Sequence, residues 1–237
     1  MGLSMLARAL VLGAVLALTA CGAPDATVVP TEGLGMFVGA VDDTRHFDGP
    51  EGRQAPPELF IAIVAAEHPA AEHERVYYAY LCDGAERSTW LLLESDGEGA
   101  VLEAGDVTVT LSGVGSNRLT NGADALTGEV SIAGEPTRAF TAERAQDDAG
   151  LYRGELVEST GHASARSAST RYVGGWIILN SGHQLGAVTV DGVVVDNPTL
   201  DVATGSVVSS VGTFSGVTTL PCIPVPRFGC IPVPQLR

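Results

Sequence analysis

The sequence contains no lysine, and all 13 of its basic residues are arginines. Acidic residues are far more numerous, 28 in all, which gives the chain a formal net charge of −15 at pH 7. A surface of this sign repels nucleic acid and anionic lipid headgroups, so no nucleic-acid partner is expected. Two interpretations of the acidity remain open: a plain solvated surface, or the binding of a cation or a basic partner.

The chain also lacks an N-terminal apolar run long enough to span a membrane. The uncharged run over residues 9–23 would reach only about 22 Å as a helix, short of a hydrocarbon core of about 30 Å. It follows a weakly positive start at Arg8, and its apolar core, residues 9–17, leads into small residues. This order is typical of an export signal rather than a permanent span.

Leu18-Thr19-Ala20-Cys21 resembles the lipobox of bacterial lipoproteins. The resemblance implies cleavage before Cys21, a diacylglyceryl thioether on Cys21 and often acylation, for instance by palmitate, of the new amine. The alternative is an ordinary signal peptide with an accidental cysteine, but ordinary cleavage before Cys21 would favour a small residue in place of Leu18. The resemblance thus implies a lipid anchor at the extracytoplasmic face of the cell membrane, with the membrane as a partner. Together with the absence of lysine, which suggests a GC-rich genome, it indicates an actinobacterial source.

Four segments are expected along the chain. Residues 1–20 are the lipoprotein signal peptide, and residues 21–33, a mixture of Pro, Gly and small residues, form a flexible tether. Residues 34–216 form a β-rich extracytoplasmic domain, and residues 217–237 a Pro-rich tail that contains cysteine.

Three cysteines remain once Cys21 is assigned to lipid, and export permits a disulfide between two of them. Cys222 and Cys230 flank two prolines and a short turn-like stretch, so a local bridge is the first choice, worth about 2–3 kcal/mol in the chain-entropy model. Cys82 would then be a buried thiol at a strand end. The rival pairing joins Cys82 to one of the tail cysteines.

No stretch shows a long 3.6-residue apolar period, which argues against a helical core. Short β-rich runs separated by Gly and Asp turns predict instead an all-β fold, an antiparallel meander that forms a partly closed barrel or a sandwich. One or two helical turns are allowed at residues 68–74 and 141–148. The expected strands are residues 36–41, 59–64, 75–82, 89–93, 107–111, 126–132, 137–142, 151–156, 172–179 and 184–190.

Several details of these runs are specific. Residues 59–64 are apolar on both faces and are therefore expected in the centre of a sheet, whereas residues 107–111 and 126–132 alternate. Asp191-Gly192 predicts a two-residue type I′ hairpin turn, because both residues accept positive φ angles. Trp90 and Trp176 lie in apolar strands and should be buried.

A second resemblance covers roughly residues 36–190. Tyr80-Leu81-Cys82-Asp83-Gly84, Trp90-Leu91, the run from Ala149 to Arg153, and Gly174-Gly175-Trp176 with Gln184 and Gly186 look like a recurrent module of exported actinobacterial proteins. The resemblance implies the compartment and the β architecture. It transfers no catalytic residue, because no activity is settled for the module.

Signatures of catalysis are missing. Gly113-x-Gly115-Ser116 and Gly212-Thr213-Phe214-Ser215-Gly216 both fail the spacing of a nucleophile elbow. The best metal candidate, Glu67 to Glu74 with His68 and His73, has poor ligand spacing and is interrupted by Pro69, so a solvated acidic loop is favoured. The acidic pairs at residues 42–43 and 147–148 lack a calcium loop. We therefore expect no catalytic residue, no metal and no cofactor.

Tyr77, Tyr78, Tyr80 and Trp90 either line a ligand pocket or, more commonly for aromatics on adjacent strands, belong to the core. Three functions remain: a non-enzymatic envelope lipoprotein that binds or assembles with another envelope protein, a barrel that carries an apolar envelope ligand, and a hydrolase with a dispersed site. A hollow β-domain would favour the carrier.

The tail repeats itself, since residues 222–226 recur as residues 230–234. Its prolines discourage regular sheet pairing, so an extended or polyproline-like chain is expected. It is either a disulfide-clipped cover that packs along the domain, the favoured reading, or an element that recognises a partner.

Overall fold

The computed structural model describes residues 34–42, 58–68, 75–95, 98–115, 125–159, 169–220, 222–225 and 229–232. The chain divides into two units, residues 1–30 and 31–237, and every described residue belongs to the second. The described ranges contain strands and turns and no helix. No helix in these ranges is therefore long and apolar enough to cross a membrane. The predicted signal peptide, Cys21 and the tether lie outside the described residues.

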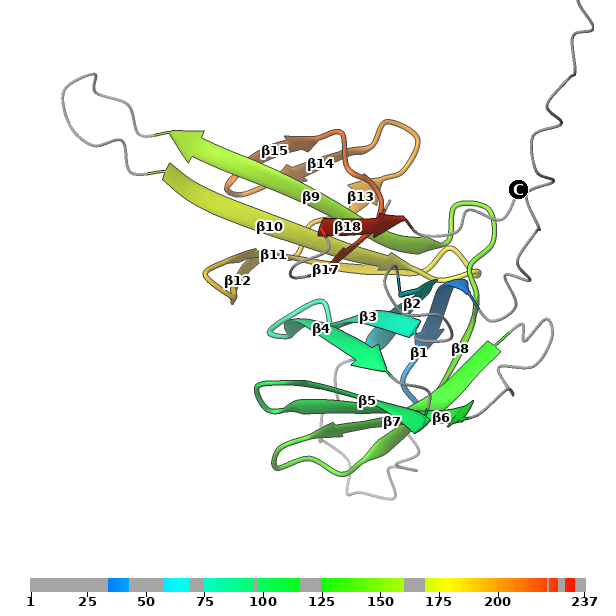
Figure 1. Ribbon diagram of the computed structural model, residues 1–237. Helices are drawn as coiled ribbons and strands as arrows, with labels where there is room; N and C mark the ends of the chain where they lie inside the picture. The colour runs from blue at the N-terminus through cyan, green and yellow to red at the C-terminus, as the bar shows by residue number, and fades with distance from the viewer. Residues whose placement is uncertain are drawn as a thin grey trace, which may run out of the picture. The chain divides into compact units, whose positions relative to one another are not determined.

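The first sheet is an eight-stranded antiparallel meander (Figure 1). Its strand order is β4-β3-β2-β1-β8-β7-β6-β5, so β1 pairs with β8, and the one ladder that is missing separates β4 from β5. These two strands still lie side by side. The prediction of an all-β, partly closed barrel is confirmed. The strands are β1 (Gly35–Ala40), β2 (Phe60–Glu67), β3 (Arg75–Cys82), β4 (Ser88–Ser95), β5 (Glu98–Ala104), β6 (Val107–Gly115), β7 (Ala125–Ile132) and β8 (Arg138–Arg144).

The barrel interior is filled by apolar side chains in strict alternation. Val107, Val109 and Leu111 of β6 point inwards while Thr110 is exposed, as the sequence predicts. β2 is buried on both faces: Ile61 and Ile63 enter the barrel. The rest of the interior includes Phe37, Ala65, Tyr77, Ala79, Leu81, Leu91, Leu102, Leu126, Val130, Phe140 and Ala142.

The prediction that allows a helical turn at residues 141–148 is wrong. Residues up to Arg144 continue strand β8, and Ala149 closes a turn by donating its N–H to the carbonyl of Gln146 at 2.8 Å. The physical reason is the alternation of β8, in which Phe140 and Ala142 are buried and Thr141 and Glu143 exposed. A period of two favours a strand over a helix.

The second sheet has the order β12-β11-β10-β9-β16 and continues the meander (Figure 1). Asp191 and Gly192 join β11 to β12 with φ angles of 50° and 80°, which confirms the predicted hairpin turn. A third, small sheet follows, in the order β13-β14-β15. The strands are β9 (Gly150–Ser159), β10 (Ser169–Ile178), β11 (Gln184–Val190), β12 (Val193–Asp196), β13 (Leu200–Asp201), β14 (Ser206–Ser209), β15 (Gly212–Ser215) and β16 (Thr218–Thr219).

The three sheets pack through two further apolar clusters. The outward faces of β2 and β3 meet the second sheet in one cluster, which joins Phe60, Val64 and Tyr80 to Leu151 and Ile177. The opposite face of the second sheet meets the third sheet in the other cluster, which includes Trp176, Ile178, Val188, Leu200, Val207, Phe214 and Val217. Burial on both faces explains why β2 and β3 carry a charged residue only at Glu67, the end of β2, and at Arg75, the start of β3.

The prediction that the tail avoids sheet pairing is wrong. β17 (Cys222–Val225) and β18 (Gly229–Pro232) form a two-stranded antiparallel sheet, in which Pro224 lies opposite Cys230 and Pro232 opposite Cys222. Every second pair of an antiparallel ladder exchanges no backbone hydrogen bonds, so a proline there removes no donor from the ladder. The two copies of the repeat therefore pair with each other.

Candidate functional site: a charged cleft at the barrel mouth

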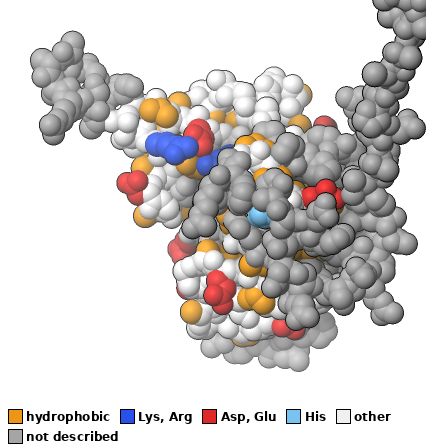
Figure 2. Space-filling view, in the orientation of Figure 1, with side chains coloured by type: hydrophobic (Ala, Val, Ile, Leu, Met, Phe, Trp, Pro, Cys, Tyr) orange, Lys and Arg blue, Asp and Glu red, His pale blue; other side chains and the backbone are white. Residues whose placement is uncertain are grey.

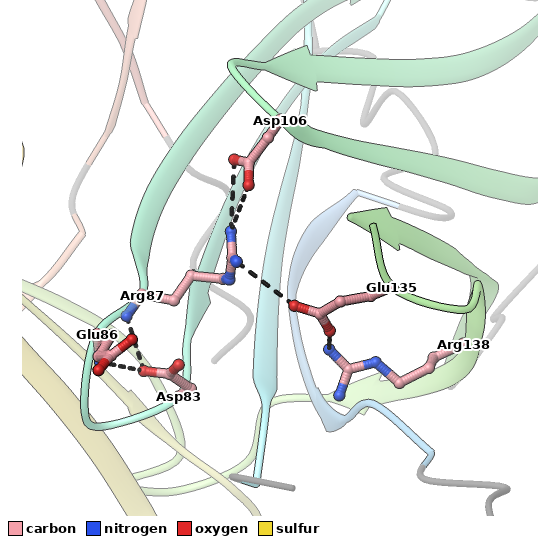
Figure 3. A network of polar contacts seen from close by, with 6 residues as sticks. All are labelled: Asp83, Glu86, Arg87, Asp106, Glu135 and Arg138. Carbon is pink, nitrogen blue, oxygen red and sulfur yellow. Dashed lines mark hydrogen bonds and ion pairs between the residues drawn. The ribbon is translucent and has the colours of Figure 1, made fainter. Parts of the chain in front are cut away.

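One end of the barrel opens into a cleft of about 560 Å³, here called the mouth cleft. Three turns surround it: those that join β3 to β4, β5 to β6 and β7 to β8. Its charged lining is Asp83, Glu86, Arg87, Asp106, Glu135 and Arg138 (Figure 3). Leu59, Ser88, Thr89 and Gly192 complete it, and Gly192 belongs to the hairpin turn of the second sheet.

The β3–β4 turn is held by the carboxylate of Asp83. Its Oδ1 accepts the backbone N–H groups of Ala85, Glu86 and Arg87 at 2.8, 2.9 and 2.8 Å. Gly84 has a φ angle of 66°, a conformation that glycine adopts without strain. A short polar side chain that bonds its own turn fixes the backbone, so Arg87 starts from a well-defined position at the cleft.

A chain of ion pairs runs from turn to turn across the cleft (Figure 3). Arg87 reaches Asp106 with Nη1 at 3.4 Å from Oδ2, and Glu135 with Nη2 at 3.7 Å from Oε1. Glu135 in turn accepts a hydrogen bond from Nη2 of Arg138 at 3.1 Å. The distances on Arg87 are long and its partners are partly exposed, so these contacts are weak. They bring together three turns that are far apart in the sequence.

Arg138 is the unusual member of this chain. It occupies an inward position of β8, on the same face as Phe140 and Ala142, and only 7% of it is exposed. Its Nε is buried and has no hydrogen-bond partner among the described residues. A buried donor without an acceptor costs about 1–3 kcal/mol, so this guanidinium closes the apolar interior with part of its bonding capacity unused.

The lining carries two more carboxylates than guanidinium groups. Glu86 is exposed and forms no ion pair within the described part of the chain, and the side chain of Asp106 is 56% exposed. Figure 2 shows acidic side chains scattered over the face in view, while arginine atoms gather at one place. The cleft is therefore a polar site with a negative balance that retains free carboxylate oxygens.

The aromatic residues singled out from the sequence belong to the packing. Tyr77 points into the barrel, and the rings of Tyr78 and Tyr80 lie 5.3 and 4.1 Å from that of Trp90. Tyr80 donates a hydrogen bond to the carbonyl of Gly175 at 3.2 Å, and its burial raises its pKa well above the usual value. Trp90 is half-buried and Trp176 fully buried, so the expectation of burial is confirmed for Trp176 and only partly met by Trp90.

The cysteine predictions are confirmed where the structure describes them. Cys222 and Cys230 form a disulfide with a Cα–Cα distance of 5.4 Å, and Cys82 is a free, buried thiol. The rival pairing of Cys82 with the tail is thereby wrong. Burial raises the pKa of the Cys82 thiol to about 11, although a hydrogen bond from the Gly84 N–H lowers it in part.

We expect Cys82 to be nearly inert towards thiol reagents in the folded protein. At pH 8 a pKa of about 11 leaves the thiolate about a hundredfold scarcer than at an exposed cysteine. Labelling by Ellman's reagent, followed at 412 nm, should be slow in buffer and fast in guanidinium chloride. Equal rates in the two solvents would contradict the buried position.

The metal and calcium candidates are only partly described. Glu67 ends β2 opposite Arg75 of β3, and His68 follows, whereas Glu72, His73 and Glu74 lie outside the described residues. No group of three metal-ligating side chains gathers within the described ranges. Asp42 is described while Asp43 is not, and Asp147 and Asp148 lie in the turn before β9.

The mouth cleft itself was not found from the sequence. Arg138 lies in residues 137–142, which the sequence predicts as an ordinary strand, although an arginine at an inward position of an apolar alternation is a usable signal. Asp83-Gly84 predicts only a turn, because Asp106 and Glu135, which line the same cleft, come from other turns that reach it only in the folded chain.

Comparisons of the chain with protein-family models, with curated proteins and with solved structures find no match.

Proposed function

We propose that this chain is an exported lipoprotein, anchored by lipid on Cys21 to the extracytoplasmic face of the cell membrane, whose β-domain acts by binding a partner and not by catalysis. The observation that carries the proposal furthest is the Cys222–Cys230 disulfide. Disulfides persist in oxidising compartments outside the cytosol. This supports the export that Leu18-Thr19-Ala20-Cys21 suggests.

Binding is favoured over the alternatives by the architecture of the domain. The barrel interior is occupied by its own side chains, so it gives no support to a carrier of an apolar envelope ligand. The mouth cleft has an ionic lining, and none of the described residues that line it is a histidine or a cysteine. That composition suits recognition of a polar partner better than nucleophilic hydrolysis, the remaining alternative.

The negative balance of the chain bears on the class of partner. With a formal charge of −15, the surface repels nucleic acid. It attracts basic proteins over a distance of about 10 Å at ordinary ionic strength. An envelope protein is therefore the class of partner that fits the composition best.

The anchor can be tested by replacing Cys21. We expect the wild-type protein to partition into the detergent phase of Triton X-114, and Cys21→Ala to shift it to the aqueous phase or to leave the leader uncleaved, because two or three acyl chains hold a protein stably on a membrane. Mass spectrometry of the mature N-terminus should find Cys21 with its lipid.

Cys82→Ala is the matched control, since it removes a cysteine without touching the anchor and should leave partitioning unchanged. An unmodified mature N-terminus at another residue would refute the lipoprotein proposal.

A further inference from the structure

Two Asp-Gly pairs lie among the described residues, and each forms a turn: Asp83-Gly84 joins β3 to β4, and Asp191-Gly192 joins β11 to β12. We infer that Asp191 is a site of spontaneous covalent modification, where aspartate isomerises to isoaspartate, whereas the fold protects Asp83 from the same reaction. The inference concerns the chemistry of the chain itself and depends neither on the lipid anchor nor on a partner.

The reaction needs no reagent except water. The backbone nitrogen of the glycine attacks Cγ of the aspartate, so that an N–Cγ bond forms, a Cγ–O bond breaks, and the N–H proton leaves with that oxygen as water. A second water molecule then opens the cyclic imide. Opening at Cγ restores aspartate, and opening at the main-chain carbonyl leaves isoaspartate. Glycine favours the attack because it carries no Cβ and its backbone turns freely.

Both reacting groups are free at Asp191-Gly192. The two residues are exposed. A two-residue hairpin turn pairs the backbone groups of the flanking residues, here Val190 and Val193, and gives the N–H of its second residue no place in the ladder. Among the described residues, no hydrogen bond joins the Gly192 N–H or the Asp191 carboxylate to a partner. The carboxyl group therefore reaches the nitrogen without breaking a side-chain contact.

Asp83-Gly84 has the same two residues, but its turn holds both reacting groups. Oδ1 of Asp83 accepts three backbone N–H groups of its own turn at 2.8 to 2.9 Å (Figure 3). The Gly84 N–H is donated to Sγ of Cys82 at 3.4 Å, and both residues of the pair are half-buried. Because these bonds must break before Gly84 can attack, the reactive conformation is rarer here than at Asp191.

Isoaspartate at Asp191 would change the hairpin between β11 and β12 (Figure 1). It lengthens the backbone by one methylene, whereas a two-residue turn requires Val190 to lie opposite Val193. In the described chain β12 pairs with β11 alone, so it has no second ladder to hold it. Gly192 also lines the mouth cleft. The modification should therefore loosen β12 and alter one wall of the cleft as the protein ages.

The test compares the two pairs within one sample. The full purified chain is kept at 37 °C and pH 6 for several weeks, and peptide mapping with electron-transfer fragmentation measures isoaspartate at each site. We expect isomerisation at Asp191 to be at least about tenfold faster than at Asp83. Fragmentation also separates these two sites from the pairs outside the described residues, Asp48-Gly49, Asp96-Gly97 and Asn121-Gly122.

Unfolded chain in guanidinium chloride is the control. Both sites carry Asp followed by Gly, so their rates should agree within about threefold once the turns are lost. Asp83 should accelerate strongly on unfolding, because its hydrogen bonds disappear. The isoaspartate-191 form, separated by chromatography, should show hydrogen exchange about tenfold faster in β12 and unchanged in β10.

Two matched variants sharpen the comparison. Asp191→Asn keeps the hairpin turn, because Asn-Gly suits the same φ angles, and releases ammonia in place of water, which speeds imide formation. Asp83→Asn retains Oδ1 as the acceptor of the three N–H groups and should stay slow. Mass spectrometry follows both through the conversion of the amide to the acid.

Three results would overturn the inference: equal rates at Asp191 and Asp83 in the folded protein, a rate ratio that survives unfolding, or an Asp191→Asn variant that deamidates no faster than Asp83→Asn. Hydrogen exchange in β12 that does not change in the isoaspartate form would overturn its structural consequence. None of these measurements reads the lipid on Cys21, so failure of this inference is distinct from failure of the proposed function.

Discussion

Replacing Trp176 with alanine is expected to lower the free energy of unfolding by about 3–5 kcal/mol. The indole is fully buried between the second and third sheets, and its ring lies edge-on to Phe214 with centroids 6.0 Å apart. Its Nε1 donates a hydrogen bond to the carbonyl of Pro198 at 2.9 Å, which ties the start of the third sheet to β10. Truncation to alanine removes the packing and the bond together.

Urea unfolding followed by circular dichroism measures this loss, and two variants serve as comparisons. Trp90→Ala removes a half-buried indole and should cost less. Trp176→Phe keeps an aromatic ring but leaves the Pro198 carbonyl without this donor. Its loss of unfolding free energy should lie between those of Trp90→Ala and Trp176→Ala. A loss below about 1 kcal/mol for Trp176→Ala, the size expected at an exposed site, would contradict the packing of the third sheet.

Two glycines explain how the indole fits against the sheet. A Cβ at Gly174 or at Gly186 would collide with the Trp176 ring, which lies across the two positions on neighbouring strands. Gly186 is the cross-strand partner of Trp176. The glycines that carry the sequence resemblance around Gly174-Gly175-Trp176 thus make room for aromatic side chains, and the Cβ of a residue at Gly175 would likewise meet Tyr80 and Trp90.

Much of the fold could be predicted because it is encoded locally. The alternation of Val107 to Leu111, the two apolar faces of residues 59–64 and the turn at Asp191-Gly192 each depend on a few neighbouring residues. The disulfide could be predicted for the same reason, since its two cysteines are close in sequence. Strands β5 and β13 to β16 are short or interrupted by Gly and Thr, so their patterns are too weak to predict them.

The mouth cleft could not be predicted because it depends on closure of the meander. Three separate turns supply Arg87, Asp106 and Glu135. These residues meet only because the pairing of β1 with β8 curves the sheet into a barrel. No spacing in the sequence records that pairing. Arg138 gave a local signal, but its meaning depends on which face of β8 is inside.

The tail has two chemically different faces. Ile223 and Ile231, directly opposite each other on β17 and β18, are 0% and 7% exposed and join the cluster between the first two sheets. Pro224 and Cys230 are exposed on the other face. The buried pair favours the tail as a cover for the core, and the exposed face leaves room for recognition. Deleting residues 217–237 would not separate these roles, because Val217 and Leu220 are themselves buried in the core.

Point variants of the tail separate the two roles. Ile223→Ala combined with Ile231→Ala should lower the free energy of unfolding by about 4 kcal/mol or more, because each truncation of a buried isoleucine costs about 2–5 kcal/mol. Cys222→Ser combined with Cys230→Ser should cost about 2–3 kcal/mol, since it frees a short loop in the unfolded chain only. Pro224→Ala changes the exposed face and should leave stability within about 0.5 kcal/mol of the wild type. If the isoleucine pair proves neutral while Pro224→Ala abolishes crosslinking to an envelope protein, the tail is a recognition element. If the isoleucine pair lowers the free energy of unfolding strongly while Pro224→Ala leaves crosslinking unchanged, the tail is a structural cover that packs against the first two sheets.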